Sequence, residues 1–225
     1  MDTLLTWSPI MSDSLNHLQA HHGDFANFRD VMITTSVGRF GPIWWGVWDQ
    51  HVQAEGAVTV VDLGCGPGML LPQLRQRLPD ARLIGVEVQP VMLETASEVA
   101  AGCGAEIIVA DLAAPVPLPD GCADVVAAVM SFHELEFPPP LIEEAFRLLK
   151  PGGMFVLYDW VKRPLSAYLG DKALDEGLLQ HFREHCLFSA DDLTFLVERA
   201  GMGVREVVGR RGGNYAIIVA EKATE

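Results

Sequence analysis

Short apolar runs alternate with segments of helical periodicity over much of the chain. Five of the runs are rich in β-branched residues, as expected of strands that are covered on both faces. They are residues 58–63, 82–88, 106–110, 123–130 and 154–160. Because parallel strands in one sheet are joined through helices, the alternation predicts an α/β fold built on a parallel sheet.

The predicted helices have clear boundaries. Each of three stops at a proline or glycine, residues that commonly follow a helix. These helices are 69–78, 91–101 and 141–149. Farther on, Ser189 is a predicted N-cap of a helix that reaches Ala200. Apolar runs over 204–209 and 215–220 then flank Gly212-Gly213, which predicts a β-hairpin.

Two segments fall outside this alternation, residues 1–53 and residues 161–188. We expect both to form helical cap material on a sheet domain that spans 54–225. Trp44 and Trp48 are four residues apart and therefore share one helix face. Their pattern is consistent with packing against the sheet and also with an aromatic wall for a flat or cationic ligand.

A glycine-rich loop follows the first predicted strand, as Gly64-x-Gly66-x-Gly68. Glycines at a strand-to-helix turn let the backbone approach a ligand, and the helix offers its first amide groups. Position 69 is Met, so the dinucleotide fingerprint is incomplete, and no Gly-Lys-Ser/Thr of a P-loop follows. The loop predicts a nucleotide-like ligand, and a tight turn without a ligand is the alternative.

Two acidic residues stand where the next strands end. Glu87 closes the second predicted strand, about twenty residues after the loop, and Asp111 follows the third. Open α/β sheets bind ligands at the carboxyl ends of their strands, and a carboxylate there can accept hydrogen bonds from ribose hydroxyls. Their shared position favours a ligand site over two unrelated surface residues.

These motifs resemble, in order and spacing, those of the class I S-adenosylmethionine-dependent methyltransferase family. The resemblance covers residues 58–160, and the terminal hairpin is similar to the reversed last strand of that fold. It therefore implies a Rossmann-like, mostly parallel seven-stranded sheet with an antiparallel last strand. The motifs are Val-Val-Asp-Leu-Gly-Cys-Gly-Pro-Gly at 60–68, Gly-Val-Glu-Val at 85–88, Ala-Asp-Leu at 110–112, Ala-Asp-Val-Val at 123–126 and Leu-Leu-Lys-Pro-Gly-Gly at 148–153.

The resemblance also implies the cofactor, S-adenosyl-L-methionine, and the residues that hold it. The loop is expected to receive the methionine portion, Glu87 the ribose and Asp111 the adenine, while Asp62 orients the loop. The full set implied for the cofactor is Asp62, Gly64, Cys65, Gly66, Gly68, Glu87, Val88, Asp111, Leu112 and Met130.

The methyl acceptor is expected between the strand ends and the two cap segments. His133 follows the fourth strand and is our predicted general base, since a histidine titrates near neutral pH. The other residues expected near the acceptor are Trp44, Trp48, Asp159, His181 and His185. The acceptor atom is left open among oxygen, nitrogen, sulfur and carbon.

No metal is predicted. His17 and His21 are spaced four apart, as are His181 and His185, but no carboxylate or cysteine completes either pair as a site. The four cysteines are scattered without a Cys-x-x-Cys pair, which favours a reducing compartment, and we expect a cytoplasmic protein.

The net charge of the chain disfavours some classes of binding partner. The formal net charge is -14, and nucleic-acid binders rely on Lys and Arg to neutralise phosphates, so DNA and RNA are disfavoured. No apolar run reaches the roughly 18 residues of a membrane span. We therefore expect a small-molecule substrate. A non-catalytic protein that binds S-adenosylmethionine and an NAD-dependent oxidoreductase are the alternatives.

Overall fold

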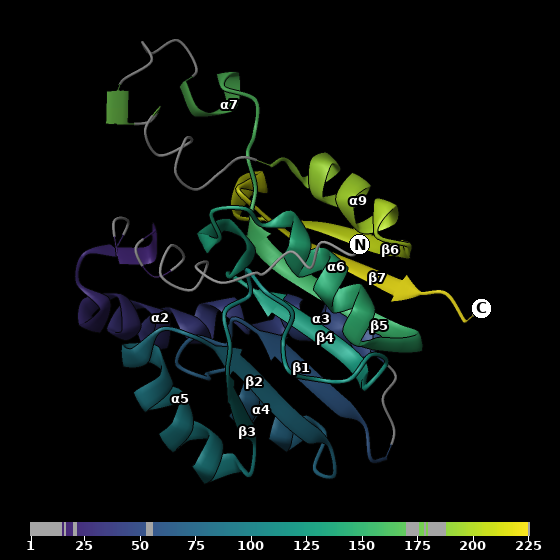
Figure 1. Cartoon of the computed structure of the whole chain (residues 1–225). Coiled ribbons are helices and arrows are strands. Elements are labelled where there is room, and N and C mark those ends of the chain that lie inside the picture. The colour runs from purple at the N-terminus through teal and green to yellow at the C-terminus, as the bar shows by residue number, and fades with distance from the viewer. Residues whose placement is uncertain are drawn as a thin grey trace, which may run out of the picture.

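A single seven-stranded sheet forms the centre of the protein (Figure 1). The computed structural model describes residues 15, 17–19, 22–52, 56–169, 176–177, 179 and 188–224. The strands lie in the order β3-β2-β1-β4-β5-β7-β6, and β7 alone runs in the direction opposite to the other six strands. This confirms the predicted fold class. The strands are β1 Thr59–Leu63, β2 Arg82–Glu87, β3 Glu106–Val109, β4 Ala123–Val129, β5 Leu149–Trp160, β6 Met202–Arg210 and β7 Tyr215–Lys222.

Helices cover both faces of the sheet because successive strand residues point to opposite sides. Val61 of β1 packs into the core beneath α6 and α9, whereas Val60 packs into the core beneath α3 and α4. The helices are α2 Phe25–Arg39, α3 Pro42–His51, α4 Leu71–Arg77, α5 Pro90–Cys103, α6 Pro139–Leu148, α7 Ser166–Leu169 and α9 Ala190–Arg199, with short 3-10 turns η1 Phe132–Glu134 and η2 Arg211–Gly213.

The predicted N-terminal cap divides into two parts with different places. Helix α3 belongs to the core layer, since Trp44 is 0% exposed and Trp48 is 2% exposed. The Trp44 ring stacks on Tyr158 of β5, with 5.9 Å between ring centroids. The expectation that these tryptophans wall an acceptor pocket is thereby corrected, because the sheet already covers them. Helix α2 lies instead beside the top of α5 (Figure 1).

Strand β5 starts five residues earlier than predicted. Leu149 pairs with Ala123 before the register shifts at an irregularity around Gly152 and Gly153. Gly152 has a φ of +76°, and a Cβ on Gly153 would lie 2.9 Å from the carbonyl oxygen of Lys150. The Pro-Gly-Gly stretch, interpreted as a helix exit, is thus also a bulged entry to the strand.

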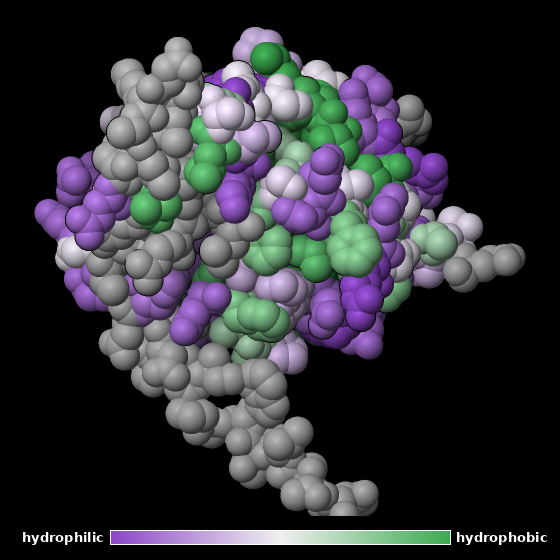
Figure 2. Space-filling view, turned by 90° about the horizontal axis from the view of Figure 1, so that it is seen from above, coloured by the Kyte–Doolittle hydropathy of each residue, from purple (hydrophilic) through white to green (hydrophobic). Residues whose placement is uncertain are grey.

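The order in which successive strands are added to the sheet reverses between β1 and β4. The chain leaves β1 toward α4 on one face and leaves β4 toward α6 on the other, which opens a crevice between the two strand ends. Seen from above, the surface mixes polar and apolar side chains in small groups (Figure 2). Among the described residues, no helix is long and apolar enough to cross a membrane.

Candidate functional site

The glycine loop takes a backbone path that other residues adopt only with strain. Gly64, Gly66 and Gly68 have φ values of +71°, +55° and +79°. A Cβ on Gly64 would lie 2.5 Å from the Cβ of Ser131, whereas a Cβ on Gly66 would meet nothing within 4 Å. Gly64 is therefore required by close packing, and Gly66 faces open space in which a ligand fits.

Glu87 joins this loop to the end of β2. Its carboxylate accepts hydrogen bonds from the backbone N–H groups of Gly66 at 2.9 Å and of Val88 and Gln89 at 2.8 Å each. Burial raises the pKa of Glu87, although these three amides act in the opposite direction. A carboxylate has about four acceptor positions, so one remains for a ligand hydroxyl.

A cavity with about 750 Å³ of empty space, its mouth included, lies between this loop and helix α2. We call it the loop pocket. Its lining includes seven of the residues predicted for the cofactor, namely Gly64, Gly66, Glu87, Val88, Asp111, Leu112 and Met130. Asp62 and Cys65 line a smaller adjoining cavity that shares Gly64 and Met32 with the loop pocket.

Two buried carboxylate oxygens at this site have no hydrogen-bond partner among the described residues. They are Oδ1 of Asp62 and Oδ2 of Asp111. Burial, with a smaller contribution from Glu87, raises the pKa of Asp62 to about 7. An unpaired buried acceptor is costly, so these oxygens suit a ligand that brings N–H donors to both ends of the site.

Two predicted cofactor residues have mainly structural surroundings. A Cβ on Gly68 would lie 3.4 Å from Ala96 of α5, and Gly68 does not line the loop pocket or its adjoining cavity. Gly68 therefore lets α5 pack closely against the loop, and its expected ligand contact stays a prediction. Cys65 lines the adjoining cavity, but burial raises the pKa of its thiol well above the usual value, which makes it unreactive.

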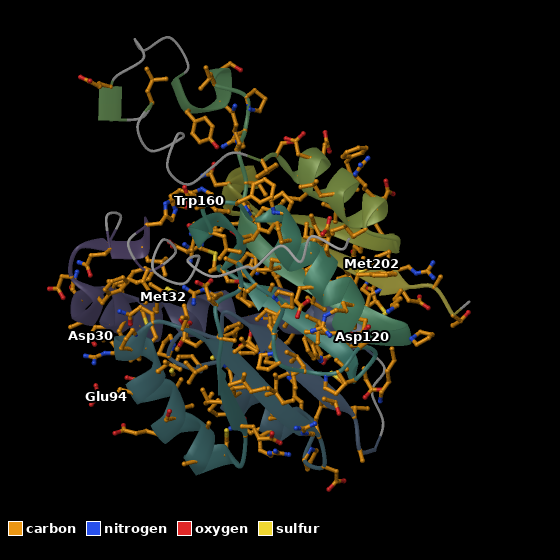
Figure 3. All side chains as sticks on the ribbon, in the orientation of Figure 1. Asp30, Met32, Glu94, Asp120, Trp160 and Met202 are labelled. Carbon is orange, nitrogen blue, oxygen red and sulfur yellow. The ribbon has the colours of Figure 1, made fainter. Side chains whose placement is uncertain are left out.

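A second cavity, with about 860 Å³ of empty space, adjoins the loop pocket. We call it the aromatic pocket. It shares Phe28, Met32, Met130 and Glu134 with the loop pocket. Figure 3 labels Met32 on α2 and Trp160 at the end of β5, which both line it. The remaining lining residues are His22, Val31, Thr35, Arg39, His133, Tyr158, Arg211 and Tyr215.

His133 lies in a chain of alternating carboxylates and imidazoles at the boundary of the two pockets. Its Nδ1 is 2.6 Å from Asp159, and its Nε2 is 3.1 Å from Glu134. The other oxygen of Glu134 is 2.7 Å from Nε2 of His22. Burial alone lowers the pKa of His133, but the two carboxylates outweigh it and hold this pKa well above the usual value.

This arrangement corrects two expectations. Both ring nitrogens of His133 contact a carboxylate, Asp159 on one side and Glu134 on the other, so neither nitrogen is placed to take a proton from an acceptor. Asp159 is 0% exposed and accepts hydrogen bonds from the backbone N–H groups of Phe132 and Trp160, so it positions His133 and does not reach an acceptor.

The second predicted cap segment is described only in part, so its expected contribution to the site stays a prediction. His181 and His185 lie outside the described residues, as does His21. None of the described residues of 161–188 lines the loop pocket or the aromatic pocket. In the part of the chain that is described, no three His, Cys, Asp or Glu side chains come together as metal ligands.

Sequence reasoning missed the residues that α2 and the hairpin bring to the aromatic pocket. Arg39 ends α2, Arg211 lies in η2, and Tyr158 and Tyr215 come from neighbouring strands. None of them belongs to a motif. Glu134, which also lines this pocket, could have been noticed from the sequence because it directly follows His133.

Comparisons with known proteins agree with this geometry. A family described as a methyltransferase domain matches residues 61–157. Trans-aconitate 2-methyltransferase of Paracidovorax citrulli is 37% identical over 107 residues, which are 48% of this chain and 40% of that protein. Demethylmenaquinone methyltransferase of Thermus thermophilus is 32% identical over 111 residues, 48% of this chain and 50% of that protein. The chain thus matches half or less of the length of these relatives.

A solved structure extends the similarity to almost the whole fold. The SAM dependent methyltransferase from Aquifex aeolicus is 24% identical, with a TM-score of 0.67, and the match covers 88% of this chain and 98% of that one. The methyltransferase-domain match covers residues 61–157, and the sheet order together with this structural similarity shows the fold that is typical of class I S-adenosylmethionine-dependent methyltransferases.

Proposed function

We propose that this protein transfers a methyl group from S-adenosyl-L-methionine to a small-molecule acceptor. The observation that carries the proposal is the shared boundary of two cavities. The loop pocket and the aromatic pocket meet at Phe28, Met32, Met130 and Glu134, so a donor in one and an acceptor in the other would come together there.

The residues around the loop pocket fit the cofactor. Asp111 has a free buried oxygen for the adenine amine, Glu87 has one remaining acceptor position for the ribose, and Asp62 has a free oxygen for the ammonium group of the methionine portion. When bound, the cofactor supplies a methyl group on a positively charged sulfur.

The chain itself contributes orientation and exclusion of water. Helix α2 places Phe28 and Met32 over both pockets, and these apolar side chains keep water from the boundary. Met130 holds a φ of +58°, which is strained for a residue with a side chain and is the kind of conformation found at ligand sites. Holding two reactants in one geometry can lower a reaction barrier by about 7–11 kcal/mol.

Glu134 keeps a negative charge at this boundary. Its burial acts to raise its pKa, but His133 and His22 outweigh burial and lower the pKa well below the usual value. An ionised Glu134 suits a cationic donor next to it. We assign His133 as a positioning residue that orients Glu134, with Asp159 holding His133 from behind.

Two observations favour a small acceptor. The net charge of -14 disfavours nucleic acid. The relatives named above act on trans-aconitate and demethylmenaquinone, according to their names, and neither is a macromolecule.

The proposal is tested in two stages with the purified protein. Calorimetry should show binding of S-adenosylmethionine and no comparable binding of NAD. Incubation with cofactor that carries a labelled methyl group, over a panel of small metabolites, should then label at least one acceptor. Binding without transfer to any acceptor would favour a regulatory protein, and preferential binding of NAD would contradict the proposal outright.

A further inference from the structure

The aromatic pocket carries arginines that have no acidic partner. Arg39 and Arg211 line it, and Arg210 lies beside it with its Cζ 5.7 Å from the centre of the Tyr158 ring. Among the described residues, none of the three forms an ion pair, in a chain whose net charge is -14. Ion pairs with carboxylates are made by other arginines, namely Arg29, Arg77, Arg82, Arg147 and Arg205.

Within the described part of the chain, the hydrogen bonds of these arginines leave most of their N–H donors unused. Arg39 bonds to the sulfur of Met32 at 3.4 Å and to the hydroxyl of Thr35 at 3.1 Å. The guanidinium of Arg211 lies 5.4 Å from the centre of the Tyr215 ring. Nη1 of Arg210 is buried and has no hydrogen-bond partner in the described ranges of the chain. A guanidinium has five N–H donors in a planar fork that matches a carboxylate.

The acidic groups near the pocket are already committed. Glu134 is shared between His133 and His22, and Asp159 is buried beneath His133. The direct contacts of these carboxylates are therefore with the histidines, and among the described residues none of them forms an ion pair with an arginine of the pocket. Burial lowers the pKa of Arg39, which shows that its charge is partly desolvated without full compensation.

Aromatic rings form a wall of the same pocket. Trp160 and Tyr215 stack with 5.8 Å between ring centroids and 11° between their planes, and Tyr158 lies 6.1 Å from Tyr215. Phe28 of α2 also lines the pocket. Such surfaces favour a flat, unsaturated molecule.

We propose that the methyl acceptor carries a carboxylate on a flat, unsaturated body, with the carboxylate bound by Arg211 and Arg39. This inference rests on the proposed function and adds the substrate class. Arg211 is the discriminating residue. Arg39 also lines the cavity beside Asp62 and is within reach of the methionine end of a cofactor, whereas Arg211 lines the aromatic pocket and not the two cavities of the cofactor site.

The test uses the full chain saturated with S-adenosylhomocysteine, so that no turnover occurs. Calorimetric titrations compare two carboxylates, 4-hydroxybenzoate and trans-cinnamate, with their uncharged amides. We expect at least one acid to bind about tenfold or more tightly than its amide, the ratio for a hydrogen-bonded charged group. Arg211→Gln should bring the acid and the amide within about threefold, and Arg211→Lys should keep part of the preference.

Arg205→Gln is the matched control, because Arg205 lies on β6, the strand that leads into the η2 turn of Arg211, and pairs with Glu221 on the surface. It should retain the full preference. Equal binding of acids and amides, no binding of any acid, or an unchanged preference in Arg211→Gln would overturn the inference. Binding of S-adenosylhomocysteine is measured first in each protein. A wild-type protein that does not bind it would contradict the proposed function. A wild-type protein that binds it but shows no preference for acids over amides would contradict only the substrate class.

Discussion

The loop pocket and the aromatic pocket are neighbours, but the carboxylates around them are arranged in opposite ways. Around the loop pocket, Asp62 and Asp111 each keep a buried oxygen that no described residue bonds. At the edge of the aromatic pocket, Asp159, His133, Glu134 and His22 are bonded to one another in a chain. The oxygens of the first set are available to a ligand, whereas the groups of the second set already bond to one another.

The difference indicates which substitutions should affect ligand binding and which should affect stability. Buried polar groups that pair with each other contribute to the folded state, and removing one leaves the other uncompensated. Groups that pair only with a ligand contribute to affinity. Substitutions in the chain of His133 should therefore lower stability, whereas substitutions around the loop pocket should weaken ligand binding.

The largest expected effect is on stability, at His133. Replacing His133 with Ala leaves two buried carboxylates without their shared cation, and we expect the free energy of unfolding to fall by about 3–5 kcal/mol in urea denaturation. His51→Ala is the matched control. Its partner Glu206 lies 2.7 Å away in a more exposed pair, which should be worth about 1 kcal/mol or less. Equal losses in the two variants would remove the distinction between the pockets.

The stabilising effect of His133 should depend on pH in a defined direction. Because its folded-state pKa is raised, the contribution is complete below the ordinary histidine pKa of about 6.5 and is lost as pH rises through the raised value. The stability difference between wild type and His133→Ala should thus narrow in alkaline solution. A difference that widens above neutral pH would mean that His133 is neutral in the folded protein.

The next effect is on cofactor affinity, at Glu87. Glu87→Ala removes an acceptor for the cofactor and the bonds that shape the loop, so binding of S-adenosylmethionine should weaken by about 1.5–3 kcal/mol in calorimetry. Glu94→Ala, an exposed position on α5, is the control. Unchanged affinity in Glu87→Ala would show that the cofactor does not use this strand end.

A smaller effect is expected at Gly66, where strain and occupied space can be separated. Gly66→Val should lower stability by about 1–2 kcal/mol because of its left-handed backbone, and should weaken cofactor binding at least about tenfold because the side chain enters open space above the loop. Gly46→Ala on α3 has no atom within 4 Å of the new Cβ and should stabilise the helix by about 0.5–1 kcal/mol. Full cofactor affinity in Gly66→Val would place the ligand elsewhere.

The smallest effect is the pH dependence of cofactor binding through Asp62. With a pKa of about 7, Asp62 is largely protonated at pH 6 and largely ionised at pH 7.5, and its ionised form attracts the ammonium group of the cofactor. Affinity should rise about fivefold over this range in calorimetric titrations. Asp62→Asn should flatten the profile. A profile that keeps its slope in Asp62→Asn would assign the titration to another group, such as Glu87.

The sequence alone determined the sheet and the cofactor side of the site. Strand ends, the glycine loop, Glu87 and Asp111 are specified by short segments whose β-branched runs, glycine positions and acidic residues can be interpreted locally. Because parallel strands bring their carboxyl ends to one edge, residues from separate segments were predicted to meet there, and the structure brings Gly66, Glu87 and Asp111 into one cavity.

Only the tertiary structure decided the acceptor side. His22 meets Glu134 across 112 residues of sequence, and Arg39 meets Arg211 at one pocket although no motif contains either. Burial in the structure also determined the role of the tryptophans, since a helix face with Trp44 and Trp48 is equally suited to a core and to a ligand wall. The charge of His133 was decided in the same way: a histidine's pKa depends on the carboxylates that surround it in space, and Asp159 reaches it from the end of another strand.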